Sequence, residues 1–190
     1  FVVDVIEPSI TAVTLFNVSL SADGNATLVS SDLIDTHDDN CGISGSRANQ
    51  TDFSCLDLGR RPVEVTTTDL SGNEATDVAT VMVLDEIPPA VSARQGLVIS
   101  LNASGNGLLL AQDAVNASSD NCGVASITLN RTQVSCADVF AAQPFALTAK
   151  DSSGNEDTAV FSVSVVDTTP PFVASVGVLN VSLDSSGRVE

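Results

Sequence analysis

The chain contains 190 residues, of which 24 are acidic and 7 are basic, and its formal net charge at pH 7 is −17. Nucleic acid is excluded as an expected partner, because binding to phosphates requires a basic surface. Hydrophobic residues make up 43% of the chain, which is typical of a folded protein. Since no apolar run approaches the ~20 residues of a membrane-spanning helix, we expect no membrane span in this stretch of sequence.

An internal repeat organises the sequence. The residues Asp-Asn-Cys-Gly at 39–42 return at 120–123, an offset of 81 residues. A second cysteine and an acidic turn containing Ser-Gly-Asn-Glu recur in the same order, and residues 1–27 align without a gap with residues 164–190. We therefore predict two whole repeats and an overlap, as expected for a segment of a longer array of modules.

The repeat divides the chain into four parts. Residues 1–4 are predicted to be the last strand of a preceding module, 5–87 a first immunoglobulin-like module, 88–168 a second one, and 169–190 the first strands of a following module. Prolines mark the joints, at Pro8, Pro88, Pro89, Pro170 and Pro171. Because proline fixes φ and lacks a backbone donor, we expect short, stiff linkers at these positions.

The first predicted element is a β-hairpin. Apolar and polar residues alternate from Phe16 to Leu20, which places Asn17 on the solvent side, and a Gly-containing turn precedes a second strand that ends at Leu28. The same pattern spans residues 98–110. Alternation on both sides of a short turn predicts a hairpin in each module.

The last predicted element of each module is a longer hairpin. Val63, Val65 and Thr67 lead to the turn at 69–73, and alternating apolar residues return as far as Val83. The second module has the corresponding apolar residues Phe145, Leu147, Ala149, Phe161, Val163 and Val165. With short strands, regular turns and no helical periodicity, the predicted fold is all-β, with tandem immunoglobulin-like antiparallel β-sandwich domains.

Four cysteines occur as two per repeat at the same spacing. We predict one disulfide inside each module, Cys41–Cys55 and Cys122–Cys136, each closing a loop worth about 3 kcal/mol in the chain-entropy estimate. The alternative, a zinc site, would require close Cys-x-x-Cys pairs, which are missing. Disulfides indicate an oxidising compartment.

Seven of the twelve asparagines lie in Asn-x-Ser/Thr sequons, which indicates N-glycosylation in the secretory pathway. The sequons are at Asn17, Asn25, Asn49, Asn102, Asn116, Asn130 and Asn180. Asn49 and Asn130 occupy equivalent positions in the repeat, as do Asn17 and Asn180. The alternative is that the chain contains many sequons simply because it is rich in Ser and Thr.

Acidic residues near the linkers are candidate calcium ligands, because oxygen ligands could converge between modules. The candidates are Asp4, Glu7, Asp39, Asp85, Glu86, Asp120 and Asp167. The alternative is that these side chains satisfy backbone groups in turns, a role that suits Asp69 and Asp151 especially well. No other cofactor is expected. His37 lies in an acidic stretch, but the second repeat lacks the histidine, which argues against a metal site there.

Several motifs together carry a resemblance to a family. They are Asp-Asn-Cys-Gly at 39–42, Phe-Ser-Cys at 53–55, the strand and turn at 63–73, Val-Met-Val-Leu-Asp at 81–85 and Pro-Pro at 88–89. In this order they resemble the hyalin-repeat family and its immunoglobulin-like relatives in secreted and cell-surface proteins. The resemblance covers essentially the whole chain, although Val134 and Gln143 replace Phe53 and Arg61 in the second copy. It implies an extracellular tandem module used in adhesion or surface structures, and no catalytic residues.

The predicted function is therefore structural and not enzymatic: a glycosylated extracellular rod or filament, such as an algal flagellar hair, assembled with other copies of the repeat chain. The single histidine and paired cysteines leave no Ser-His-Asp or Cys-His arrangement. The main alternative is the spacer stalk of a cell-surface adhesin, stiffened by calcium, with its binding head elsewhere. A third is the accessory region of an enzyme. A sugar-binding face is disfavoured, because the chain has no Trp or Tyr.

Overall fold

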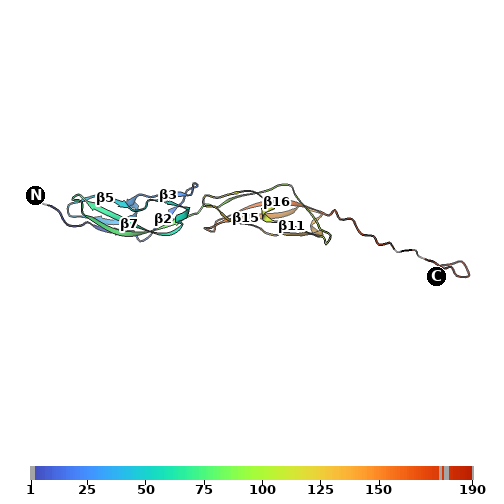
Figure 1. Ribbon diagram of the computed structural model, residues 1–190. Coiled ribbons are helices and arrows are strands. Elements are labelled where there is room, and N and C mark those ends of the chain that lie inside the picture. Colours follow the sequence, from blue (N-terminus) through green and yellow to red (C-terminus); the bar gives the residue numbers. More distant parts are fainter. Residues whose placement is uncertain (1–2, 176, 178–179, 190) are drawn as a thin grey trace.

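A computed structural model describes residues 3–175, 177 and 180–189. Two bodies built from strands lie end to end, and the C-terminal residues extend beyond the second one (Figure 1). We call the body of strands β1–β8 the first module and that of β9–β16 the second module. The N-terminus lies at the free end of the first module (Figure 1).

Both modules repeat the same order of short elements. The first contains β1 (Ser9–Ala12), β2 (Phe16–Ser19), β3 (Asn25–Thr27), β4 (Ile34–Asp38), β5 (Ile43–Ala48), β6 (Asp52–Ser54), β7 (Gly59–Asp69) and β8 (Glu74–Leu84), with 3₁₀ helices η1 (Ser30–Leu33) and η2 (Cys55–Asp57). The second contains β9 (Ala90–Ala93), β10 (Leu97–Ser100), β11 (Asn106–Leu108), β12 (Val115–Ser119), β13 (Val124–Leu129), β14 (Gln133–Ser135), β15 (Gln143–Asp151) and β16 (Glu156–Val166), with the helical turn α1 (Ala111–Ala114) and the 3₁₀ helix η3 (Cys136–Asp138).

Each module is a β-sandwich. In the first module a four-stranded sheet of order β2-β8-β7-β5 packs against the strand pairs β1-β4 and β3-β6. The second module has the sheet β10-β16-β15-β13 and the pairs β9-β12 and β11-β14. All pairings are antiparallel except β2 with β8 and β10 with β16, which are parallel. The fold is therefore all-β, with tandem immunoglobulin-like modules, as the sequence predicted.

The cores contain the faces that alternation predicted. Val63, Val65, Thr67 and Val81 are fully buried in the first module. In the second module the buried residues include Phe145, Leu147, Ala149, Phe161, Val163 and Val165. The long hairpins β7–β8 and β15–β16 are confirmed, with Val65 opposite Asp77 and Leu147 opposite Ala159.

The hairpins predicted at 15–28 and 98–110 are wrong. The strands exist, but β2 pairs with β8 while β3 pairs with β6 in the opposite layer. Ser21 N donates to Asn25 O and Gly24 N donates to Ser21 O, in a turn that carries the chain from one layer to the other. Both Leu20 and Leu28, on either side of this turn, point into the core. Alternation identifies the buried face of a strand but not its partner.

The predicted terminal strands are not formed among the described residues. Phe1 and Val2 lie outside the described residues, and Val3 and Asp4 belong to no strand. Between 169 and 190, the described residues contain only an isolated bridge between Leu183 and Val189. The physical reason is that β2, the counterpart of this stretch, pairs with the last strand of its own module. The assignment of both ends to neighbouring modules stays a prediction.

One turn of the C-terminal stretch does repeat the module pattern. Asp184 N donates to Arg188 O and Gly187 N donates to Asp184 O. The turns that follow β2 and β10 contain the same two hydrogen bonds, from Ser21 and Gly24 and from Asn102 and Gly105. These 21–24, 102–105 and 184–187 turns require a glycine with positive φ at the last position, between 72° and 77°.

Candidate functional site at the junction between modules

A disulfide crosses from one module to the other. Cys55, at the start of η2, is bonded to Cys122, which precedes β13, with a Cα–Cα distance of 5.3 Å. Cys41 and Cys136 are unbonded and exposed. The predicted bonds Cys41–Cys55 and Cys122–Cys136 are therefore wrong, and the staple joins two modules instead of closing a loop inside each.

The geometry of β7 explains this correction. Cys41 lies at the Asp69 end of that strand, where Leu70 N donates to Gly42 O, while η2 lies at the other end, where Arg61 donates to its carbonyls. The 11 residues of β7 separate the two ends by about 30 Å at ~3.3 Å per residue. A disulfide requires Cα atoms within about 7 Å. Each of the two modules therefore has a head cysteine, Cys41 or Cys122, at one end and a tail cysteine, Cys55 or Cys136, at the other, and this arrangement gives the equal spacing in the two repeats.

The bonded cysteines are surrounded by polar contacts between the modules. Asn121 Nδ2 donates to Ser21 O at 3.3 Å and to Asp85 Oδ1 at 3.1 Å. Gly24 packs so closely that a Cβ there would lie 2.8 Å from Asn121 O and 2.9 Å from Cys55 Sγ. The junction therefore combines a covalent bond, hydrogen bonds and a close backbone approach that requires glycine.

The acidic turn of the second module holds the linker, residues 85–89. Asn155 Nδ2 donates to Asp85 O at 3.0 Å and lies 3.5 Å from Ile87 O. The same amide donates to Asp151 Oδ2 at 2.8 Å, while Asp151 Oδ1 accepts from Gly154 N and Asn155 N. Burial raises the pKa of Asp151, but these hydrogen bonds outweigh burial, and the pKa lies below its usual value. The predicted turn role of Asp151 is confirmed.

The first module contains an equivalent clamp. Asn73 Nδ2 donates to Asp4 O at 3.3 Å, to Ile6 O at 3.1 Å and to Asp69 Oδ2 at 2.7 Å. Asp69 Oδ1 accepts from Ser71 N and Asn73 N, which confirms its predicted turn role as well. In each module, the asparagine side chain of the Ser-Gly-Asn turn thus donates hydrogen bonds to the backbone of the segment that precedes the module.

Three carboxylates converge at the junction. One oxygen from each of Asp85, Asp120 and Asp151 lies within 4.8 Å of the others. Asp85 is only 6% exposed, and its Oδ2 lacks a hydrogen-bond partner among the described residues, as do Asp120 Oδ1 and Asn121 Oδ1. Unpartnered buried carboxylate oxygens are costly. These oxygens form a ligand set that suits a hard cation such as Ca²⁺.

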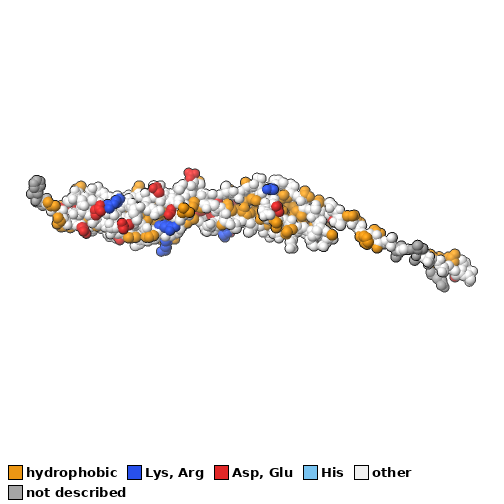
Figure 2. Space-filling view, viewed as in Figure 1, with side chains coloured by type: hydrophobic (Ala, Val, Ile, Leu, Met, Phe, Trp, Pro, Cys, Tyr) orange, Lys and Arg blue, Asp and Glu red, His pale blue; other side chains and the backbone are white. Residues whose placement is uncertain are grey.

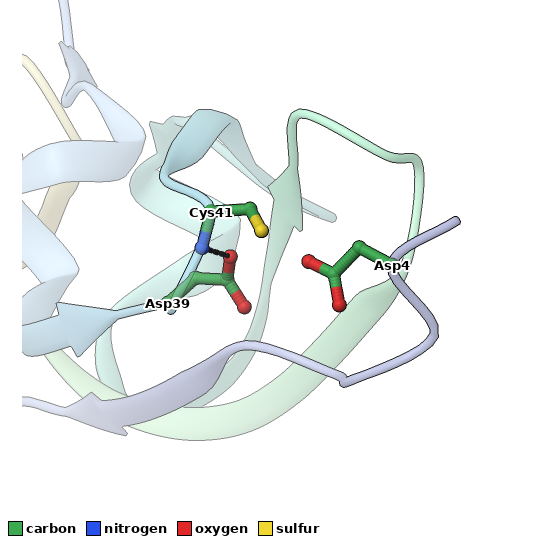
Figure 3. Close-up of side chains that lie close together, drawn as sticks. All are labelled: Asp4, Asp39 and Cys41. Carbon is green, nitrogen blue, oxygen red and sulfur yellow. Dashed lines mark hydrogen bonds between the residues drawn. The ribbon is translucent and has the colours of Figure 1, made fainter. Parts of the chain in front are cut away.

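The free end of the first module contains a related cluster, in which a thiol stands in place of the third carboxylate. Asp4, Asp39 and Cys41 point toward one another (Figure 3), and their nearest ligand atoms lie within 4.8 Å. Asp39 Oδ2 accepts from Cys41 N at 2.7 Å, while Asp4 Oδ2 and Asp39 Oδ1 are unpartnered among the described residues. The proximity of the Cys41 thiol and the Asp4 carboxylate raises the pKa of Cys41 and lowers the pKa of Asp4.

The structure divides the predicted calcium ligands into two groups. It brings together Asp4 with Asp39, and Asp85 with Asp120, but neither cluster includes Glu7, Glu86 or Asp167. Glu86 instead accepts from Ser19 Oγ at 2.6 Å, and Asp167 is exposed. Sequence reasoning missed Asp151 as a member of the cluster and Asn155 as the linker clamp. The recurrence of Ser-Gly-Asn just before the last strand was the available signal.

All seven sequon asparagines are exposed. Asn49 and Asn130 have a further structural role, because their Oδ1 atoms accept from Glu64 N and Ala146 N at 3.0 Å. N-glycosylation modifies Nδ2, so these backbone contacts are compatible with a glycan. Glycosylation itself stays a prediction.

No helix in the described part of the chain is long and apolar enough to span a membrane. A surface groove of about 520 Å³ lies beside β4 and is lined by residues such as Leu28, Ile34 and Thr51. His37 also lines it, exposed, with its Nδ1 3.5 Å from Ser46 Oγ. Acidic side chains lie at several places on the first module (Figure 2), and the whole chain contains 24 acidic and 7 basic residues.

Fold and junction together define a tandem chain of β-sandwich modules linked by a disulfide between neighbours. No known family profile matches the chain. The chain is similar to hyalin of Strongylocentrotus purpuratus, with 35% identity over 152 residues, and the alignment covers 75% of this chain and 12% of hyalin. The resemblance of the two modules to hyalin repeats is thus confirmed, for a segment that spans about an eighth of hyalin's length.

Two solved structures of tandem domains are also similar to the chain. Immunoglobulin domains 1–4 of Sidekick-1 match 84% of this chain and 48% of their own, with 10% identity and a TM-score of 0.48. Drosophila N-cadherin EC1-4 matches 85% of this chain and 50% of its own, with 14% identity and a TM-score of 0.44. The sheet topology of each module defines the fold of this chain.

Proposed function

We propose that this chain is a structural segment of an extracellular glycoprotein, whose modules are joined end to end into a stiff rod or filament with other copies of the same repeat. The observation that carries the proposal is the junction: Cys55–Cys122 binds the modules covalently, while Asn121 and Asn155 both donate hydrogen bonds to Asp85 of the linker. A linker held at both sides limits bending. The disulfide and the resemblance to hyalin repeats support an extracellular location.

A non-catalytic role agrees with the chemistry of the side chains. The only histidine is exposed on β4, and the cysteine thiols at the junction are consumed in a disulfide. The acidic groups at the junction act on backbone amides and on the linker. The seven exposed sequons would supply N-glycans that keep the surface of such a rod hydrated.

Small-angle X-ray scattering of the oxidised chain tests the rod. The expected profile is that of two modules end to end, unchanged by protein concentration. Electron microscopy of longer native arrays should show unbranched, end-to-end fibres. A scattering profile of two side-by-side modules or of a flexible ensemble would contradict the rod, and microscopy showing only dispersed modules would contradict the filament.

A calcium-stiffened spacer stalk of an adhesin is the second candidate. The unpartnered oxygens of Asp85 and Asp120, repeated at Asp4 and Asp39, favour it. Titration of CaCl₂ into the oxidised chain should release or absorb heat and raise Tm, since a ligand that binds only the native state stabilises it. Asp85→Asn with Asp120→Asn should remove the part of the effect that arises at the junction and leave the part that arises at Asp4 and Asp39, while Glu86→Gln should change neither. An equal Tm in CaCl₂ and in chelator would remove calcium from the account.

A further inference from the structure

The two unbonded cysteines occupy the positions of the bonded ones. In repeat register, Cys136 is the counterpart of Cys55, and Cys41 is the counterpart of Cys122. Both Cys41 and Cys136 are exposed. We propose that Cys136 forms an inter-module disulfide with the Cys41-type cysteine of a following module of the same repeat, so that every junction in such an array is covalently closed.

The tail end of the second module is already shaped for this bond. Cys136 Sγ lies 3.6 Å from Gly105 O, and the bonded Cys55 Sγ lies 3.6 Å from Gly24 O. A Cβ on Gly105 would meet Cys136 Sγ at 2.6 Å, just as one on Gly24 would meet Cys55 Sγ. The φ angles of the two glycines are 73° and 72°.

Helix capping fixes both tail cysteines in the same way. Asp138 Oδ2 accepts from Ser135 N at 2.8 Å, and Asp57 Oδ2 accepts from Ser54 N at 2.9 Å. These contacts begin η3 and η2, whose first residues are Cys136 and Cys55. The thiol of Cys136 therefore sits on the same turn and beside the same glycine carbonyl as the sulfur that is bonded.

The Cys41 end of the first module has the same local structure as the Cys122 end of the second module. Asp39 Oδ2 accepts from Gly42 N at 3.0 Å, and Asp120 Oδ2 accepts from Gly123 N at 2.8 Å. Asn40 is the counterpart of Asn121, the residue that donates to Ser21 O across the existing junction. In the first module Asn40 Nδ2 lies 3.2 Å from its own neighbour, Cys41 Sγ.

The C-terminal residues supply the beginning of the module that would dock. Residues 164–190 align with 1–27 without a gap, and their 184–187 turn contains the hydrogen bonds of the 21–24 turn. In a following module, the counterpart of Asn155 would donate its hydrogen bond to Asp167, the counterpart of Asp85. Asp167 already accepts a hydrogen bond from Thr169 N, just as Asp85 accepts one from Ile87 N. The occupant that fits this end is therefore a module of the same repeat.

The chemistry is a thiol–disulfide exchange. A small-molecule disulfide, such as oxidised glutathione, is attacked by one cysteine thiolate and forms a mixed disulfide with release of one thiol. The second cysteine then attacks the protein sulfur, displaces the other thiol and closes the S–S bond. The two protein thiols lose two electrons and two protons, and the glutathione disulfide gains both.

The test extends the chain by one module. Residues 28–87 are appended after Glu190, so that 164–190 and the added segment complete a third module, and the original Cys41 is replaced by Ser. After equilibration in a glutathione redox buffer, peptides are mapped by mass spectrometry without reduction. We expect Cys136 bonded to the added Cys41 about ten-fold or more over its glutathione adduct, because docking raises the effective thiol concentration.

A second extension guards against a failure of the added segment to fold. It appends residues 109–168 with the added Cys136 replaced by Ser, and with the exposed Ala125→Ser as a mass tag that distinguishes the added Cys122, which should bond to the original Cys136. In the unextended 190-residue chain, alkylation should find two thiols, Cys41 and Cys136. Cys136 left as a thiol or glutathione adduct in both extensions, or bonded to the Cys122 of its own module, would overturn the proposal. Neither result would affect the scattering test of the rod.

Discussion

Glycine at position 24 is required by the close approach of two modules. A Cβ there would lie 2.8 Å from Asn121 O, and φ is +72°. Gly96 provides a matched control, because its φ is +69° but a Cβ would meet nothing within 4 Å. Both alanine variants should lose about 1–2 kcal/mol from left-handed backbone strain.

Gly24→Ala should lower the free energy of unfolding more than Gly96→Ala does, and it should also speed the reduction of the Cys55–Cys122 disulfide. Urea unfolding and the rate of reduction by dithiothreitol measure the two effects. Equal reduction rates in the two variants would show that the modules do not approach as closely as described.

The amide of Asn155 holds the linker, and Asn155→Ala removes hydrogen bonds to Asp151 and to Asp85 O. The expected loss of stability is about 1–3 kcal/mol, because buried acceptors are left unpaired. Asn73→Ala removes the same contacts at the free end of the first module. Both should destabilise their own module, but only Asn155→Ala should increase bending between modules in small-angle scattering. Identical scattering from the two variants would contradict a clamp.

Acid should weaken both turns. The pKa values of Asp69 and Asp151 lie below their usual values in the folded chain. The stability that these carboxylates contribute is therefore present above the unfolded pKa of about 3.9 and is lost as pH falls through the lower folded value. The double variant Asp69→Asn, Asp151→Asn should show a shallower loss of unfolding free energy between pH 5 and pH 2 than the wild type. Asp35→Asn, on exposed β4, controls for charge removal, and an unchanged acid slope in the double variant would refute the assignment.

At the scale of elements, alternation predicted the buried faces of the long hairpins but not every pairing. Val63, Val81, Leu147 and Phe161 are buried where the pattern placed them. The short strands β2 and β3 were paired wrongly, because their alternation is satisfied by a core on either layer of a sandwich. Partners of short strands depend on contacts with distant parts of the chain, which a local pattern does not contain.

The cysteine pairing was missed for a related reason. Equal spacing within each repeat suggested a disulfide that closes a local loop. In the structure Cys41 and Cys55 lie at opposite ends of the 11-residue strand β7, because the six-residue strand β5 runs along β7 between them. The repeat itself contained the correct alternative, since a head cysteine and a tail cysteine in each module can join neighbours. The turn acids, by contrast, were predicted correctly because their partners lie within a few residues.

The β15–β16 hairpin should dominate the stability of the second module. Leu147 is fully buried, so Leu147→Ala should cost about 2–5 kcal/mol through lost burial and a cavity. Val160→Ala on the same hairpin removes an exposed side chain, 72% accessible, and should change stability by less than about 0.5 kcal/mol. Urea denaturation checks both, and a similar cost for the two variants would contradict the assignment of the faces.

At the scale of the whole molecule, the disulfide joins the two sandwiches covalently. The bond closes a sequence separation of 67 residues, for which the chain-entropy estimate gives about 4 kcal/mol. Since the bond joins modules, part of this effect should appear as restricted motion of one module relative to the other. The net charge of −17 causes repulsion between molecules, which at low salt favours solubility over lateral association.

Single-molecule fluorescence energy transfer between dyes on Cys41 and Cys136 tests the central claim most directly, because these unbonded thiols lie on opposite sides of the junction. In the oxidised chain the account predicts one narrow distribution of transfer efficiency. The double variant Cys55→Ser, Cys122→Ser should give a broader distribution while both modules stay folded. A broad distribution in the oxidised chain, or no difference between the two proteins, would contradict a rigid junction closed by the Cys55–Cys122 bond.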